Sequence, residues 1–297
     1  MSDRSENFDN LDLAGRATAA IVRRPRVAAH LVLAAALGVS WFVLLAMSLR
    51  GAADVPVMSG PGGDLLQSLP LLPLPPFVEQ FFRLCVTPVA LDASRVPYFA
   101  ALSSMWFLMS LAMMLPSAAP MLRTYCEIAD TARARDEAAV HPLILVAGYV
   151  VIWALASLCF AGISLGVQRL AMSSGPLVPA AGPIGAVALL FAGLYQFSGL
   201  KEACLRKCRN PFSILFSRWS TRPCRIFRLG MKQGVWCLGC CWALMLVMFA
   251  VGLMNILWMT LIALFTVVEK QSTGKLPGRI AGAILLVWAA ALLLVSH

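Results

Sequence analysis

Apolar residues run along this chain in six long blocks, which short polar segments separate. A helix rises about 1.5 Å per residue, so about 20 apolar residues cross the ~30 Å hydrocarbon core of a bilayer. No strand-type alternation lasts long enough for a barrel, and no solenoid repeat is visible. The pattern predicts about six membrane-spanning helices, at His30–Leu49, Tyr98–Leu122, Leu143–Val167, Ala180–Leu200, Val235–Val268 and Ile280–Val295.

The fifth block, Val235–Val268, is longer than one crossing needs. As a single straight helix it would extend about 51 Å. A break near Gly252 would make two shorter helices and move the C-terminus to the other side. No proline or paired glycine interrupts the block, and this favours one helix.

Composition supports an all-α, polytopic integral membrane bundle. Of 297 residues, 60% are apolar and 13% are charged, whereas soluble domains have about a quarter of their residues charged. The net charge of +10 lies in short stretches between apolar blocks, as in membrane topology signals. We therefore expect the protein to have a lipid bilayer, and not nucleic acid, as its partner.

The basic residues also predict an orientation, because short cytoplasmic loops are enriched in Lys and Arg. Nine lie in the segment 201–232, and only Arg169 lies between the third and fourth blocks. We expect a cytoplasmic tail at 1–26 and a helical membrane domain at 27–297, with an external loop at 51–97 and the cytoplasmic segment 201–232. With six crossings, both ends would be cytoplasmic.

The second block carries a methionine stripe. Met105, Met109 and Met113 recur every four residues and so share one helical face. Pro116, close to that stripe, frees a backbone carbonyl one turn earlier. Methionine is an ordinary gap-filler, so the stripe alone is more typical of packing than of metal binding.

The fifth block strengthens the metal hypothesis. Seven of its residues fall within an arc of about 80° at 100° per residue: Cys237, Cys241, Met245, Met248, Gly252, Asn255 and Met259. Cys240 flanks this arc. Soft thiolate and thioether ligands select Cu(I), and zinc is the choice where thiolates dominate. The alternative is a packing seam in which Cys acts as a small apolar residue.

The predicted topology brings more sulfur to the cytoplasmic level of the bundle. Cys204 and Cys208 lie four residues apart just after the fourth block, and cytoplasmic thiols are rarely disulfides. Glu269 and Lys270 close the fifth block as an interfacial ion pair or a proton-handling group. The predicted metal ligands are Met109, Met113, Cys237, Cys240, Cys241 and Met245, with Cys204 and Cys208 as a relay.

Three stretches resemble an uncharacterised bacterial family described as predicted metal-binding integral membrane proteins. They are Met105–Ser117, Gln196–Cys208 and Gly239–Lys270, and the most specific segment is Cys240-Cys-Trp-Ala-Leu-Met245. Members often have Ser-Pro-Leu-Lys where this chain has Ser-Gly-Leu-Lys at Ser198–Lys201. The resemblance implies metal binding in a multi-pass bacterial inner-membrane protein, without an established activity.

These observations favour a protein that binds a soft metal and delivers it to a copper enzyme or another membrane subunit. Copper fits better than zinc, because zinc usually takes four ligands and this face offers few thiolates. Two alternatives stay open. One is a metal-dependent membrane redox or electron-transfer subunit, and the other is a structural subunit whose sulfur-rich face only packs. No catalytic motif is present, and the three histidines are scattered.

Overall fold

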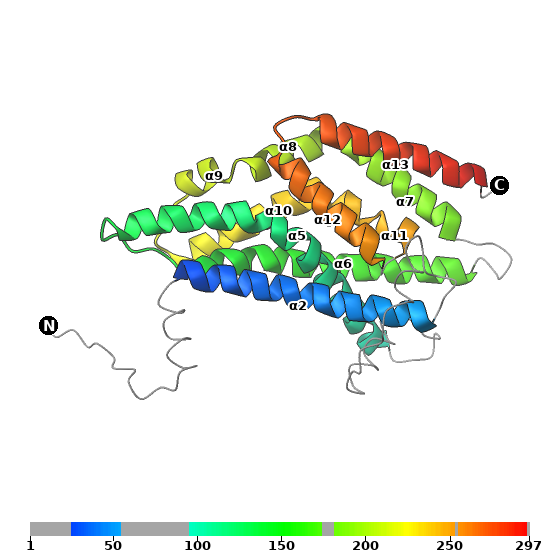
Figure 1. Ribbon diagram of the computed structural model, residues 1–297, viewed down its shortest axis with the longest axis horizontal. Helices are drawn as coiled ribbons and strands as arrows, with labels where there is room; N and C mark the ends of the chain where they lie inside the picture. The colour runs from blue at the N-terminus through cyan, green and yellow to red at the C-terminus, as the bar shows by residue number, and fades with distance from the viewer. Residues whose placement is uncertain (1–24, 55–94, 174–180, 253–254, 296–297) are drawn as a thin grey trace.

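The computed structural model describes residues 25–54, 95–173, 181–252 and 255–295, and every regular element within them is a helix (Figure 1). This confirms the all-α prediction. The predicted external loop at 51–97 and the tail at 1–26 lie almost entirely outside the described residues.

Seven of the helices run along the length of the bundle: α2 (Pro25–Asp54), α5 (Arg95–Arg133), α6 (Pro142–Ser173), α7 (Ala181–Gln196), α10 (Pro223–Met245), α12 (Ile256–Gln271) and α13 (Leu276–Val295). Three are short: α8 (Gly199–Arg209), α9 (Pro211–Ser217) and α11 (Met248–Val251). In the described part of the chain, five helices are long and apolar enough to cross a membrane. The α7–α8 pair, bent by 65°, could supply a sixth.

The predicted fifth helix is broken. Gly252 has a φ of 98°, a conformation that residues with a side chain rarely adopt. The Asn255 side chain then caps α12 by accepting a hydrogen bond from Trp258 N at 3.4 Å. The prediction of one continuous helix over Val235–Val268 is therefore wrong. Gly252 ends one helix and Asn255 starts the next, so the break occurs without a proline.

The break reverses the direction of the chain. α12 runs back beside α5, opposite in direction to α10, and α13 then turns once more (Figure 1). As a result α2 begins at one end of the bundle and α13 finishes at the other. The structure thus contradicts the expected arrangement with both ends at the same level.

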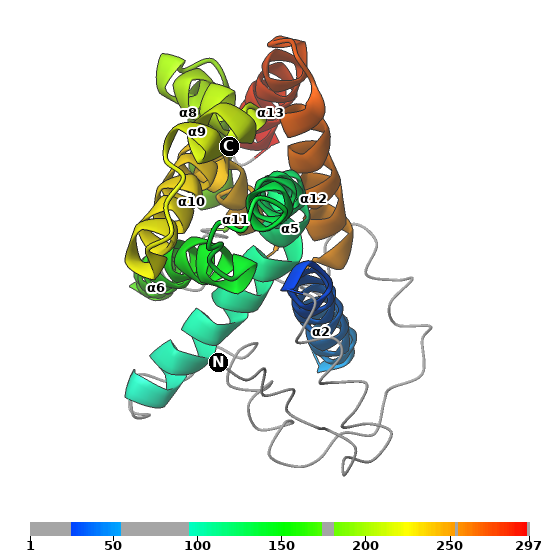
Figure 2. The same cartoon turned by 90° about the vertical axis from the view of Figure 1, so that its left-hand side faces the viewer.

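Helix α5 lies in the middle of the bundle, among α2, α6 and α12 (Figure 2). Pro116 inside α5 cannot donate to the carbonyl of Ala112. The indole of Trp41, on α2, donates to that carbonyl instead at 3.2 Å. The carbonyl that the proline frees therefore joins α2 to the central helix.

Glycines bring α6 and α10 unusually close together. A Cβ at Gly148 would lie 2.1 Å from the carbonyl oxygen of Phe227, and one at Gly230 would lie 2.0 Å from that of Leu145. Gly234 completes a Gly-x-x-x-Gly spacing, which lets helix backbones approach in membranes. This crossing brings the α6 residue Tyr149 against the sulfur face of α10.

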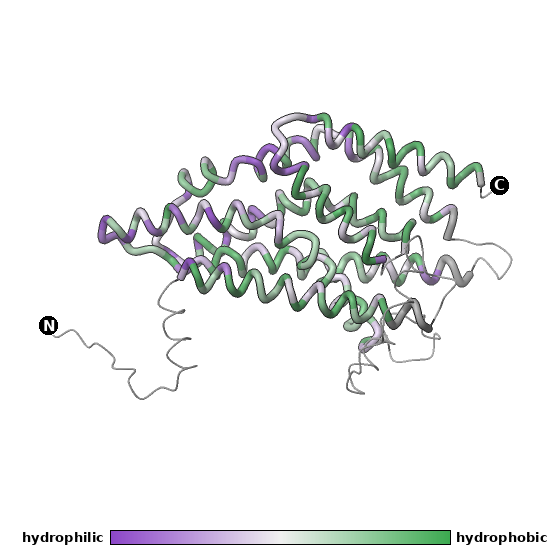
Figure 3. The backbone as a smooth tube through the Cα atoms, viewed as in Figure 1, coloured by the Kyte–Doolittle hydropathy of each residue, from purple (hydrophilic) through white to green (hydrophobic). Residues whose placement is uncertain are grey.

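Polar residues gather at one end of the bundle. This end holds the end of α5, the short helices α8 and α9 and the first turns of α10 (Figure 3). It includes the basic segment 201–232. The long helices beyond it are mainly apolar.

Candidate metal centre

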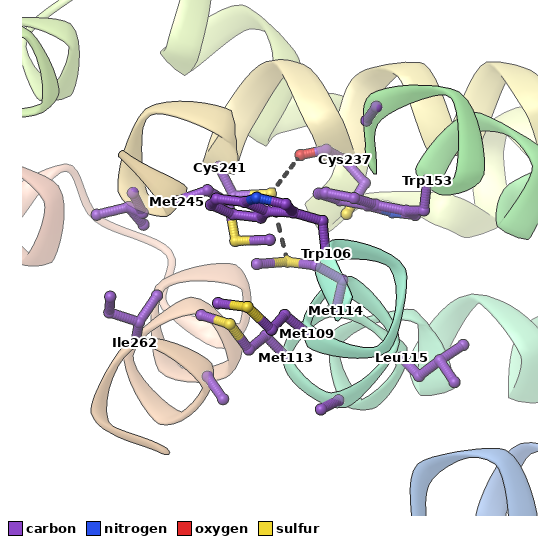
Figure 4. Packing of buried hydrophobic residues seen from close by; sticks show 14 of the residues in the cluster. Trp106, Met109, Met113, Met114, Leu115, Trp153, Cys237, Cys241, Met245 and Ile262 are labelled. Atoms are coloured by element: carbon purple, nitrogen blue, oxygen red, sulfur yellow. Dashed lines mark hydrogen bonds between the residues drawn. The ribbon is translucent and has the colours of Figure 1, made fainter. Parts of the chain in front are cut away.

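The sulfur face of α10 points into the bundle. Cys237, Cys240, Cys241 and Met245 are each at most 2% exposed. Figure 4 shows Cys237, Cys241 and Met245 among side chains from α5 and α6. These side chains therefore face other helices in the interior of the bundle.

Polar groups from three other helices surround Cys237. Its sulfur lies 3.0 Å from the Tyr149 hydroxyl and 3.0 Å from Lys270 Nζ. Lys270 also donates to the Ser117 hydroxyl at 2.6 Å, and Tyr149 donates to the Met114 carbonyl at 3.2 Å. Lys270 therefore places a positive charge directly beside the sulfur of Cys237.

Cys241 lies one helical turn after Cys237 and has a methionine partner. Its sulfur is 3.4 Å from Met114 Sδ and 2.7 Å from the Cys237 carbonyl oxygen (Figure 4). One thiol with an ammonium neighbour, a second thiol and a thioether thus come together in the interior. We call Cys237, Cys241 and Met114 the inner sulfur set.

A second pair of thiols lies between α8 and α10. Cys208 Sγ and Cys240 Sγ are 4.0 Å apart, and Cys208 is half-buried. A metal–thiolate bond in zinc sites is about 2.3 Å, so two sulfurs on one ion lie roughly 3.8 to 4.6 Å apart, from tetrahedral to linear geometry. The separation of this outer pair therefore fits a shared ion.

Gly239 makes room for the remaining thiol. A Cβ there would lie 2.7 Å from Cys204 Sγ, so the glycine lets Cys204 pack directly on α10 in its present position. The Tyr195 hydroxyl donates to the Gly239 carbonyl and joins α7 to the same turn. The structure thus places both predicted relay cysteines, Cys204 and Cys208, against α10.

The predicted methionine ligands are buried but lie elsewhere around α5. Met109 and Met113 are 0% exposed and project toward the side of α12 that carries Ile262 (Figure 4). Met245 lies near Cys241. Met114, the neighbour of Met113, makes the sulfur contact with Cys241.

The predicted Glu269–Lys270 pair has different partners. Glu269 Oε1 lies 2.7 Å from Lys201 Nζ, and both side chains are at most 3% exposed. Lys201 also donates to the Gln196 side-chain oxygen. These two neighbouring residues of α12 therefore contact different parts of the bundle. Glu269 contacts Lys201 on α8, and Lys270 contacts Cys237 on α10.

Sequence reasoning missed three groups of this site: Tyr149, which contacts Cys237, Met114, which contacts Cys241, and Ser117, which contacts Lys270. Met114 and Ser117 lie inside the stretch that carries the methionine stripe, but at other positions around the helix. Tyr149 belongs to no sequence motif. The one sequence signal near it is the preceding residue, Gly148, which lies at the close crossing of α6 and α10.

The described residues contain no group of three or more His, Cys, Asp or Glu side chains that could hold a metal ion. Four of the thiols instead form two pairs. Cys208 lies beside Cys240, and Cys237 lies one turn before Cys241, which contacts the Met114 thioether. Zinc in structural sites takes four N, S or O ligands, whereas soft thiolates and thioethers select Cu(I). The donor set fits Cu(I) better than zinc.

A helical bundle with this sulfur chemistry defines a candidate carrier of soft metal ions. Residues 103–292, which are 190 of the 297 residues, match the PpoB2 family, described as a copper chaperone. The chain belongs to this copper chaperone family. The match covers α5 to most of α13 and includes every candidate ligand. No curated protein and no solved structure matches the chain.

Proposed function

We propose that this protein is a membrane-embedded Cu(I) carrier of the bacterial inner membrane that passes its ion to a copper enzyme. Membership of the copper chaperone family supports the cargo. Helices long and apolar enough to cross a bilayer support the location. The observation that carries the proposal is the 4.0 Å approach of Cys208 and Cys240, since Cys240 directly precedes Cys241 of the inner sulfur set.

The outer pair is the proposed entry site. Cys208 is half-buried on α8, at the polar end of the bundle, and Cys240 is 1% exposed. Cys240 lies on α10 between Cys237 and Cys241, so an ion exchanged between thiols has a short path inward. Each step replaces one soft ligand by another, as Cu(I) coordination by two or three sulfurs allows.

The inner sulfur set is the proposed holding site. Cys237 and Cys241 contribute the thiolates and Met114 the thioether, while Met245, Met109 and Met113 line the surrounding sulfur-rich core. Lys270 compensates thiolate charge beside the buried Cys237. Once Cu(I) binds, one thiolate charge is balanced by the ion itself.

Copper binding by the full-length, detergent-purified protein tests the proposal. Cys237→Ser/Cys241→Ser removes the inner thiols at nearly constant volume, and Cys208→Ser/Cys240→Ser removes the outer pair. Cys159→Ser/Cys224→Ser, at two exposed positions, is the matched control. We expect a chromophoric Cu(I) chelator to strip the inner variant at least tenfold more easily than the control.

The outer variant has a different expected result. It should retain its equilibrium affinity for Cu(I) within about threefold but load several times more slowly from a Cu(I)–thiol donor. If the inner variant folds and keeps wild-type copper affinity, the holding site is wrong and the sulfur face only packs. A redox subunit would instead bring a tightly bound haem or quinone, visible in the absorption spectrum or lipid extract.

A further inference from the structure

A polar pocket lies away from the sulfur face, where α7 and α8 meet α12 and α13. Its volume is about 110 Å³, and its charged or polar lining includes Gln196, Lys201, Arg209, Glu269, Lys275 and Arg279. One buried water needs about 10–15 Å³ in the same measure. The pocket therefore has room for a group of phosphate size.

The charges of the pocket do not cancel. Lys201 pairs with Glu269 at 2.7 Å, and Lys275 pairs with Glu202 at 2.7 Å. The hydrogen bond from Lys275 lowers the pKa of Glu202, so this pair remains charged at neutral pH. Both pairs are neutral overall, which leaves the two arginines of the lining.

The two arginines are free of carboxylate partners within the described residues. Arg209 donates to the backbone carbonyls of Glu269 and Gly274 at 2.8 and 2.9 Å. Arg279 is exposed and has no ion pair in the described part of the chain. The pocket thus has a net charge of about two positive units at neutral pH.

A buried donor in the lining also lacks an acceptor. Gln196 is 7% exposed, and its side-chain nitrogen has no hydrogen-bond partner. Its oxygen already accepts from Lys201, so the amide orientation is fixed and the nitrogen remains a donor. Buried donors are nearly always paired, and an oxyanion in the pocket would supply the acceptor.

Exposed apolar side chains accompany the lining of this pocket: Phe197 belongs to it, and Leu200, Leu276 and Ile280 adjoin lining residues in the sequence. Phe197, Leu200, Leu276 and Ile280 are each more than half exposed. A soluble anion needs no apolar neighbours, whereas a phospholipid presents a phosphate and acyl chains side by side. Basic pockets between membrane helices on the cytoplasmic side are typical headgroup sites.

We propose that this pocket binds the phosphate of an anionic phospholipid, with Lys275 and Arg279 at its mouth and the Gln196 amide at its floor. The acyl chains then lie over Phe197 and Leu276. The inference rests on the membrane location in the proposed function, but not on its copper site. A bound lipid would join α7–α8 to α12–α13, the elements that carry Lys201 and Glu269.

Native mass spectrometry of the full-length protein in uncharged detergent tests this site. The probes are phosphatidylglycerol and phosphatidylcholine with identical acyl chains, and inorganic phosphate as a competitor. Lys275→Gln/Arg279→Gln removes the two charges at the mouth. Arg222→Gln/Arg225→Gln makes the same charge change at exposed positions of the N-terminal end of α10.

We expect the wild type to retain phosphatidylglycerol at least fivefold better than phosphatidylcholine, and the pocket variant to lose that preference. The α10 variant should keep it, and both variants should bind copper like the wild type. An unchanged preference in the pocket variant, or an equal loss in the α10 variant, overturns the proposal. Displacement of the lipid by millimolar inorganic phosphate would also overturn it, in favour of a soluble anion. If the wild-type protein itself does not bind copper, that result counts against the proposed function and not against the lipid site.

Discussion

At the residue scale, two neighbouring charged residues of α12 are each stabilised by different partners. Glu269 and Lys270 are successive residues, so their side chains point about 100° apart around the helix. Glu269 pairs with the buried Lys201, while Lys270 reaches Ser117 and Cys237. Each charge therefore has its own partner in the interior, where an unpaired charge is costly.

The Lys201–Glu269 pair can be tested by removing one or both charges. Lys201→Met leaves Glu269 buried without its counter-ion, and we expect a loss of about 3–5 kcal/mol in the free energy of unfolding. Lys201→Met/Glu269→Leu should recover most of that loss, because no unpaired charge remains. Unfolding by titration with a denaturing detergent measures both.

The exposed Arg123–Glu127 pair provides the control for this experiment. Arg123→Met should leave the unfolding midpoint close to that of the wild type, because exposed ion pairs contribute little. If Lys201→Met is as stable as Arg123→Met, the buried pair does not stabilise the bundle.

The inward sulfur face of α10 was predictable from sequence, whereas the partner of Cys241 was not. Helical period alone places Cys237, Cys241 and Met245 on one face, and polar or reactive groups in a bundle rarely face lipid. The choice of Met114 over Met113 depends on how α5 is rotated about its axis. That rotation results from tertiary packing against α2, α6, α9 and α12, which one helix's sequence does not encode.

At the element scale, the break after α11 shows where hydropathy alone fails. The block Val235–Val268 is apolar throughout, so its composition does not reveal a reversal. Gly252 at positive φ and Asn255 as an N-cap are a stop and a start signal. Apolar length predicts that a segment is buried, while single turn-forming residues decide its path.

The close crossing of α6 and α10 yields a prediction for two glycines of the same helix. Gly148→Ala would place a Cβ 2.1 Å from the Phe227 carbonyl oxygen, whereas a Cβ at Gly162 meets nothing within 4 Å. Overpacking typically costs about 1–3 kcal/mol, and a backbone neighbour cannot rotate away. We expect Gly148→Ala to lower the thermal unfolding midpoint and Gly162→Ala to leave it unchanged or raise it.

Intrinsic helix propensity makes this comparison strict. Alanine favours a helix over glycine by about 1 kcal/mol, so both changes stabilise α6 locally. A drop in the midpoint for Gly148→Ala alone therefore reports the crossing with α10. Equal midpoints for the two variants would mean that the helices are not in backbone contact there.

At the scale of the whole molecule, the candidate metal ligands lie close to the basic segment 201–232. The outer thiol pair joins α8, in the basic segment 201–232 at the polar end (Figure 3), to the same part of α10 that carries the inner sulfur set. Basic segments remain cytoplasmic, and cytoplasmic thiols stay reduced. If the basic segment is cytoplasmic, as we propose, the proposed entry site lies on the side where Cu(I)–thiol donors occur.

The two ends of the bundle should react differently with a reagent that does not cross the membrane. Because the chain reverses after α11, the end of α13 lies opposite to the start of α10 (Figure 1). Leu294 is 81% exposed near the end of α13, and Cys224 is exposed at the start of α10. In intact spheroplasts, a membrane-impermeant maleimide should label the thiol introduced by Leu294→Cys but reach Cys224 only after permeabilisation, as identified by peptide mass spectrometry. Arg135→Cys, in the turn between α5 and α6 at the polar end, should behave like Cys224. Labelling of positions 294 and 224 from the same face would show that Val235–Val268 crosses the membrane once and that the reversal is absent.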